Sequence, residues 1–107
     1  MTTFDSREKA EEGRFALDAE NQFKARARRD KLVGEWAAAK LGLSGAEAAA
    51  YAQSLVAADL EEHGDADVIA KLKKDFAAKS VDVSDHQISR MLAEKMAEAL
   101  HQIKSGA

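Results

Sequence analysis

The chain has 107 residues and a net charge of −3, is 46% apolar and 33% charged, and contains neither cysteine nor proline. This length predicts one domain around one core, and the lack of cysteine excludes disulfides, thiolate metal sites and a cysteine nucleophile. No apolar run approaches the roughly 18 residues of a membrane-spanning helix, and the charged N-terminus does not resemble a signal peptide. We therefore expect a soluble, cytoplasmic protein without membrane insertion. Its 23 alanines favour helices around a thin core.

The N-terminal segment favours helix but has almost nothing apolar to bury. Between Asp5 and Arg14 the only apolar side chain is Ala10. A helix without an apolar stripe does not dock on the core of its own protein. Such a segment is either a fraying terminus or an arm that becomes ordered on a partner. We expect residues 1–14 to form a mobile arm and residues 15–107 to form the folded domain.

The first predicted helix runs from about Ser6 to Leu41 and is interrupted only by Gly13. At 1.5 Å per residue it would span about 55 Å, which is too long for a small bundle. We therefore expect a bend or a frayed first part. Apolar residues repeat at three- and four-residue steps after the glycine, and this spacing predicts one buried face. That face would consist of Phe15, Ala19, Phe23, Ala27, Val33, Trp36 and Ala37.

Three further helices follow, each with its own start signal. Ser44 with Glu47 and Ser84 with Gln87 are capping-box pairs, and Asp65 is an N-cap candidate between them. Because the connections are short, we expect successive helices to be antiparallel neighbours. The predicted fold class is all-α, a four-helix bundle with a long N-terminal helix whose first part projects or is disordered. The apolar positions expected to face the core are Tyr51, Leu55, Val56 and Leu60, then Val68, Ile69, Leu72 and Phe76, then Ile88, Leu92, Met96, Ala99, Leu100 and Ile103.

No pattern typical of an enzyme occurs. The sequence has no glycine-rich phosphate loop, nucleophile elbow or metal-binding motif. His86 and His101 lie 15 positions apart on one predicted helix, about 22 Å along its axis, too far to share a metal. The adjacent Glu61 and Glu62 are better explained as solvated acids at a helix end, because nothing predicts the perturbed pKa values of a catalytic pair. We expect no enzyme, no metal and no cofactor.

Opposite charges gather in two separate parts of the chain. Residues 1–31 hold 8 basic against 7 acidic residues, and the remainder holds 8 against 12. The two clusters could attract each other, or they could present two faces to a larger partner. Because the domain is acidic and has no recognition-helix pattern, a solvated helix face is a better interpretation of the basic run than nucleic-acid binding. The basic run is Lys24, Arg26, Arg28, Arg29 and Lys31, broken by Asp30, and the acidic cluster is Asp59, Glu61, Glu62, Asp65 and Asp67.

Several separated blocks make the chain recognisable. They are TFDSREKA at 3–10, LVGEWAAAKLGLS at 32–44, VAADLEE at 56–62 and VSDHQI at 83–88. In this order they resemble the ζ subunit family of the alphaproteobacterial F-type ATP synthase over nearly the whole chain. The resemblance implies a four-helix bundle whose N-terminal segment inhibits ATP hydrolysis by the catalytic head. It implies an arm that lies between an α and a β subunit and reaches the rotating γ subunit, on a cytoplasmic protein held peripheral to the inner membrane through the ATP synthase.

The binding residues follow as a hypothesis from this resemblance. Phe4 would anchor in an apolar pocket, the charged residues after it would pair with the interface, and the segment through Phe15 would become helical on binding. Where the family pattern has an aromatic residue after Lys9-Ala10, this chain has EEG at 11–13. We therefore expect binding to be retained and inhibition to be weaker. The predicted arm contacts are Phe4, Asp5, Arg7, Glu8, Lys9 and Phe15, with a secondary basic contact face of Lys24, Arg26, Arg28 and Arg29.

The sequence is also compatible with two other functions. Arginine, lysine and Trp36 near a helix junction could hold an adenine nucleotide, with weak ATP or ADP binding in the absence of a phosphate-binding motif. Alternatively, the protein could be a non-inhibitory structural adaptor whose charged arm is only a solubilising tail. An adaptor would keep its partner affinity without residues 1–14, whereas an inhibitor would not.

Overall fold

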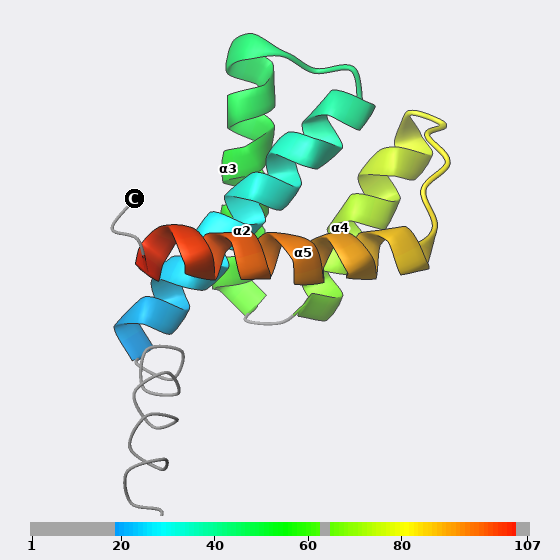
Figure 1. Ribbon diagram of the computed structural model, residues 1–107. Helices are drawn as coiled ribbons and strands as arrows, with labels where there is room; N and C mark the ends of the chain where they lie inside the picture. Colours follow the sequence, from blue (N-terminus) through cyan, green and yellow to red (C-terminus); the bar gives the residue numbers. More distant parts are fainter. Residues whose placement is uncertain (1–18, 63–64, 105–107) are drawn as a thin grey trace, which may run out of the picture.

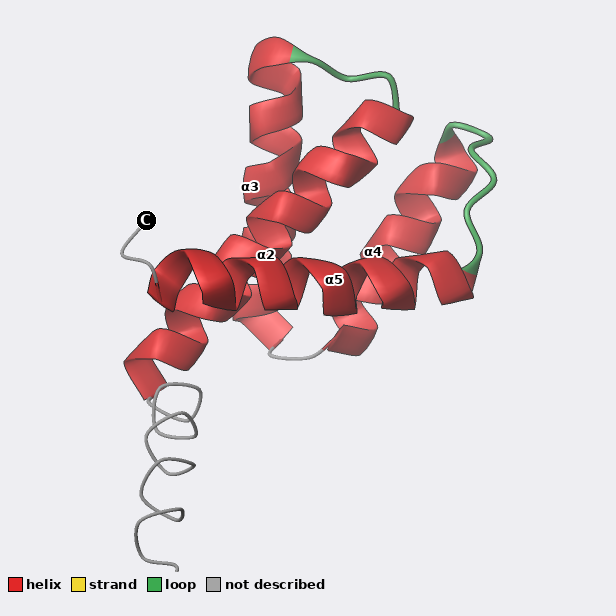
Figure 2. Cartoon of the chain, viewed as in Figure 1, coloured by secondary structure: helices red, strands yellow, loops and turns green. Residues whose placement is uncertain are grey.

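The structure is a computed structural model, and it describes residues 19–62 and 65–104. Within these ranges the chain forms four helices (Figures 1 and 2). They are α2 (Ala19–Lys40), α3 (Gly45–Glu62), α4 (Asp65–Ala78) and α5 (Asp85–Lys104). No strand occurs within these ranges. The all-α, four-helix prediction is confirmed. The expected bend or fraying near Gly13, like the predicted arm, lies outside the described residues.

Helix α2 is the centre of the fold. It packs most extensively against α3 and α5, whereas α4 has smaller contacts with α3 and α5. In Figure 1, α2 and α3 form an antiparallel pair, as expected, but α5 crosses α2. The last helix therefore has α2 as its main partner rather than the helix that precedes it, which differs from the predicted order of neighbours. Helix pairing depends on which surfaces fit together, and the connection after Ala78 leaves α5 free to cross the bundle.

The core lies between all four helices and is mainly aliphatic. Phe76 is its one large aromatic residue, and the ring of Trp36 packs edge-on against it with 5.8 Å between centroids. The edge-to-face arrangement is the favoured geometry for an aromatic pair. The predicted apolar faces of α4 and α5 are confirmed at Val68, Leu72, Ile88 and Leu92. The buried core consists of Val33, Ala37, Leu41, Leu55, Val68, Leu72, Phe76, Ile88 and Leu92.

Local chemistry defines the start of α5 and the end of α2. At the predicted pair of Ser44 and Glu47, the amide of Glu47 donates to the backbone carbonyl of Ser44 at 3.2 Å. The amide of Gln87 donates to Oγ of Ser84 at 3.1 Å, and the amide of Ser84 donates to Oε1 of Gln87 at 3.0 Å, which completes the predicted capping box. Gly42, with φ of 81°, follows α2, and the amide of Leu43 donates back to the carbonyl of Ala38 at 2.9 Å. This pattern is a Schellman motif, in which a glycine takes the left-handed position.

Three residues of the predicted apolar faces are exposed, Ala19 and two large side chains. Phe23 on α2 is 57% exposed and Leu60 on α3 is 45% exposed. The buried side of this part of α2 instead carries Ala25, Arg29 and Asp30. The prediction was wrong here because apolar periodicity treats charged residues as surface residues. Charged groups can be buried when another helix supplies their partners.

Gly34 lies at a close contact between α2 and α3. A Cβ atom at this position would be 2.6 Å from Cα of Ala52 and 3.0 Å from its Cβ, so the two backbones would have to separate. We expect Gly34→Ala to lower the free energy of unfolding by about 1–3 kcal/mol, even though alanine is the better helix former. Urea unfolding measures this change, with the exposed neighbour Glu35→Ala as the matched control. A stabilised Gly34→Ala variant would contradict the close contact.

Candidate partner-binding site

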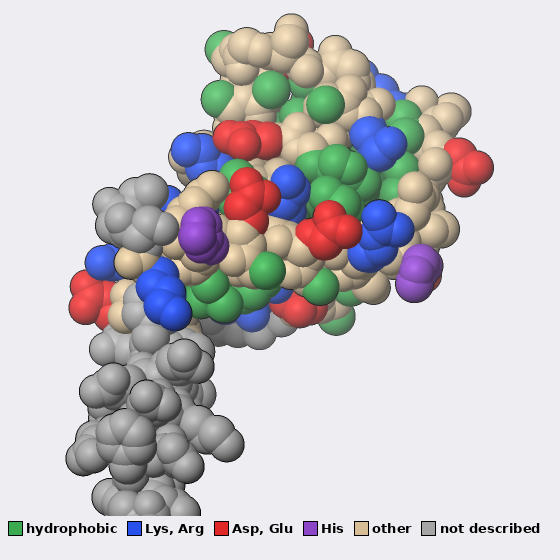
Figure 3. Space-filling view, in the orientation of Figure 1, with side chains coloured by type: hydrophobic (Ala, Val, Ile, Leu, Met, Phe, Trp, Pro, Cys, Tyr) green, Lys and Arg blue, Asp and Glu red, His purple; other side chains and the backbone are tan. Residues whose placement is uncertain are grey.

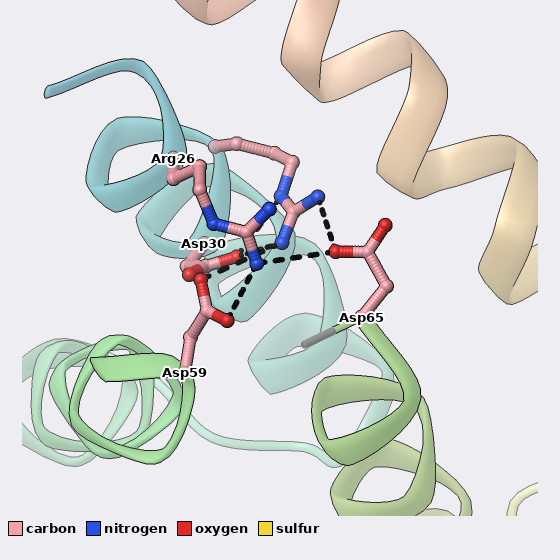
Figure 4. A network of polar contacts seen from close by, with 5 residues as sticks. Arg26, Asp30, Asp59 and Asp65 are labelled. Atoms are coloured by element: carbon pink, nitrogen blue, oxygen red, sulfur yellow. Dashed lines mark hydrogen bonds and ion pairs between the residues drawn. The ribbon is translucent and has the colours of Figure 1, made fainter. Parts of the chain in front are cut away.

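A buried network of charges joins α2, α3 and α4 (Figure 4). Arg29, Asp30 and Asp59 are 3%, 1% and 4% exposed. The guanidinium of Arg29 donates to Oδ1 of Asp30 from Nη2 at 2.8 Å and from Nε at 3.0 Å, and from Nη1 to Oδ1 of Asp65 at 2.9 Å. Nη2 of Arg26 donates to Oδ1 of Asp59 at 2.7 Å. Two arginines of one helix are thus held by acids of two others.

This network bears out the first predicted use of the charge clusters, mutual attraction, for some of their members. Arg26 and Arg29 come from the basic run, and Asp59 and Asp65 come from the acidic cluster. These members of the two clusters attract each other within the domain. Burying ions requires their desolvation, and forked hydrogen bonds such as those of Arg29 offset it in part. Removing a single partner would leave a buried charge without compensation.

Asp30 takes up a proton as the pH falls through about 7. Burial and a hydrogen bond to Asp59 raise the pKa of Asp30 to about 7, against the opposing effect of Arg29. In the part of the chain that the structure describes, no group donates to the buried Oδ2 of Asp30. Figure 4 shows its carboxyl group beside that of Asp59. When Asp30 is protonated, its O–H group can donate a hydrogen bond to the carboxylate of Asp59.

Asp59 is the ionised partner in this pair. Burial alone would raise the pKa of Asp59, but hydrogen bonds with Asp30 and Arg26 hold it below its ordinary value. With one proton on Asp30, the two arginines are balanced by the ionised Asp59 and Asp65. Without that proton, the network carries one excess negative charge.

A groove opens between α2, α3 and α5 on another part of the surface. It has a volume of about 580 Å³, and none of its described lining residues is acidic. Lys24, Arg28 and Lys31 recur at four- and three-residue spacing and therefore share one face of α2. Nη1 of Arg28 also donates to Oε1 of Gln102 on α5 at 3.3 Å. Figure 3 shows basic and apolar side chains next to each other near the start of α2. The lining residues are Phe23, Lys24, Ala27, Arg28, Lys31, Gln53, Val56 and Ile103.

The four residues of the predicted secondary basic contact face do not share one exposed face. Lys24 and Arg28 line the groove, whereas Arg26 and Arg29 belong to the charge network. Arg29 is only 3% exposed, because the acids of α3 and α4 neutralise it inside the domain. Lys31 joins Lys24 and Arg28 instead, and the binding role of this face stays a prediction. The predicted arm contacts, Phe4, Asp5, Arg7, Glu8, Lys9 and Phe15, lie outside the described residues.

Asp30 is the residue that sequence reasoning missed. It was interpreted only as an interruption of the basic run. It precedes the buried Val33 by three positions and the buried Gly34 by four, so it lies on the same helix face as both. That spacing was a usable signal for a buried acid.

Neither a metal site nor a membrane span is found in the described residues. No group of three or more histidine, aspartate or glutamate side chains within 19–62 and 65–104 is arranged to hold a metal ion. None of the described helices is both long and apolar enough to cross a membrane.

A comparison with protein families matches nearly the whole chain. The family model described as ATPase inhibitor subunit zeta matches residues 1–102. The match covers the charged segment before α2 as well as all but the end of α5, and it agrees with the resemblance seen in the sequence. No curated protein matches the chain.

Proposed function

This chain belongs to the ATPase inhibitor subunit zeta family, and we propose that it binds the catalytic head of the F-type ATP synthase and inhibits ATP hydrolysis through residues 1–14. The observation that carries the proposal is that the family match begins at residue 1. The charged segment before α2 therefore belongs to what the family shares. The protein acts as a regulator and catalyses no reaction of its own.

The composition of the arm supports a binding role on a partner. Because Ala10 is its only apolar residue between Asp5 and Arg14, the burial that orders the arm has to come from another protein. The α, β and γ subunits supply that surface, with Phe4 as the apolar anchor and Arg7 among the charged contacts. The helical bundle stays outside the cleft that the arm enters. Bound in this way, the protein is cytoplasmic and peripheral to the inner membrane.

Removing the anchor and one charged contact tests this function. We expect Phe4→Ala combined with Arg7→Ala to raise the concentration needed for half-inhibition by at least about tenfold, because few residues carry most of the energy of an interface. The measurement is ATP hydrolysis by the purified catalytic head, titrated with full-length protein. Lys74→Ala with Lys79→Ala, two exposed lysines of α4 and the residue after it, is the control. Full potency of the arm variant would contradict the proposal.

A version lacking residues 1–14 separates inhibition from simple attachment. An inhibitor loses both its inhibition and most of its affinity, whereas a structural adaptor binds as the full-length protein does. Because EEG at 11–13 removes an aromatic anchor and adds charge, we expect inhibition by the full-length protein to be incomplete.

A further inference from the structure

We propose that the groove between α2, α3 and α5 is a second docking surface, and that it receives an acidic amphipathic helix of the catalytic head. The surface is separate from the N-terminal arm. The identity of the partner rests on the proposed function. The chemistry of the occupant is inferred from the groove itself.

The apolar part of the groove is open to solvent. Phe23 forms part of its wall and is 57% exposed, while Val56 and Ile103 are partly buried. A smaller hollow of about 50 Å³ adjoins it and shares Phe23, Ala27 and Val56. Leu60, which is 45% exposed, extends the apolar wall there, and Arg26, Asp30 and Asp59 of the charge network line the rest of the hollow. Exposed apolar residues scattered singly are ordinary, but neighbouring ones beside a hollow mark an interaction surface.

The charges of the groove point to an acidic occupant. Lys24 pairs with Glu20 at 3.5 Å, but their side chains are 57% and 76% exposed, so water screens the pair. Arg26 and Arg29 are neutralised within the domain, whereas Lys24, Arg28 and Lys31 border an apolar floor without an acidic lining residue in the described chain. Carboxylates at matching spacing would pair with all three.

A helix suits this surface better than an extended peptide. The walls are helices, whose backbone groups are already paired, and the described residues form no strand edge. An extended segment would lie there with unpaired N–H and C=O groups, whereas a helix satisfies its own. Lys24 to Lys31 spans about 10 Å, or two helical turns. Two turns of an amphipathic helix can place acids along this row and apolar residues beside Phe23.

Charge reversal in the full-length protein tests the surface. We expect Arg28→Glu with Lys31→Glu to weaken binding to the purified catalytic head by at least about tenfold and to reduce the dependence of binding on salt. The control Lys74→Glu with Lys79→Glu makes the same change in net charge on exposed lysines away from the groove. Phe23→Ala tests the apolar wall without changing charge, and we expect it to weaken binding as well. Circular dichroism verifies that each variant is helical.

The outcomes separate this inference from the proposed function. If the wild-type protein does not bind the head, both are overturned. If it binds, and the groove variants and Phe23→Ala bind equally well, only the groove proposal is overturned.

Carbodiimide cross-linking identifies the occupant, because it joins lysine amines directly to carboxyl groups. We expect Lys24 and Lys31 to be linked to aspartates or glutamates at helical spacing in one amphipathic segment of the head, located by mass spectrometry. Links only to a second copy of this chain, or to no helical segment, would overturn the proposal. The proposal is also overturned if ATP shifts the NMR signals of the residues that line the groove while the groove variants keep their affinity for the head.

Discussion

The protein should lose stability as the pH rises from about 4 to about 7, because Asp30 holds a proton in the folded state that the unfolded chain has already released. The ordinary pKa of an aspartate is about 3.9, and burial with a hydrogen bond to Asp59 raises the pKa of Asp30 to about 7. A raised pKa stabilises the fold fully below the unfolded value, and this contribution is lost as the pH rises through the folded value. One proton corresponds to a slope of about 1.4 kcal/mol per pH unit, so the total change is at most about 4 kcal/mol.

The contribution of Asp59 to stability changes with pH in the opposite direction, and it does so at lower pH. Its pKa lies below the ordinary value, so its contribution is present above about pH 4 and is lost in more acidic solution. The window between about pH 4 and pH 7 therefore reports mainly on Asp30. Among the described residues, the charged groups facing Asp30 are Arg26 and Arg29 from α2, Asp59 from α3 and Asp65 from α4. The α5 residues that border the same region, Ser89, Leu92, Ala93 and Met96, are uncharged.

Asp30→Asn removes the titration while keeping the hydrogen bonds. The amide can donate to Asp59 as the protonated acid does, and its oxygen can accept from Arg29. We expect the variant to be nearly independent of pH between about 5 and 7, and to gain stability relative to the wild type as the pH rises. Urea unfolding across a pH series measures this, with the exposed Asp85→Asn as control. A wild-type slope that persists in Asp30→Asn would assign the proton to another group.

Arg29→Ala should destabilise the fold by about 3–5 kcal/mol, the range for a buried ion pair that loses one partner. The guanidinium is 3% exposed and contacts Asp30, Asp59 and Asp65, so its removal leaves the two buried carboxyl groups of Asp30 and Asp59 with Arg26 as their one remaining cation in the network. The exposed Lys24→Ala should change stability by less than about 0.5 kcal/mol. Arg29→Ala and Lys24→Ala each remove one positive charge from α2, but Arg29 is buried and Lys24 is exposed.

A double variant distinguishes the lost ion pair from lost packing. Well above pH 7, where Asp30 is ionised in the wild type, Asp30→Asn removes the charge of one of the acids that Arg29 contacts, so Arg29→Ala should cost less in that background than in the wild type. Equal costs in the two backgrounds, measured by urea unfolding, would mean that packing rather than charge explains the effect. If Arg29→Ala proves as mild as Lys24→Ala, the network does not hold α2 against α3 and α4.

Local chemistry explains which features could be predicted. The capping box of Ser84 and Gln87, the turn at Gly42 and the apolar stripes of α4 and α5 involve residues at most a few positions apart. Capping, glycine conformation and helical periodicity act over that range, so they can be recognised without the fold. The family resemblance was likewise visible in contiguous blocks. The binding residues of the arm stay a prediction from that resemblance.

The sequence by itself therefore determined the four helices, the end of α2, the start of α5 and most of the aliphatic core. Only the tertiary structure decided that α5 crosses α2, that Gly34 meets Ala52 and that Phe23 borders an open groove. It also decided which charges are buried. The contacts of Arg26 with Asp59 and of Arg29 with Asp65 join residues 33 and 36 positions apart. A buried charge is stable only beside a partner, and no periodicity within one helix indicates which distant helix will supply it.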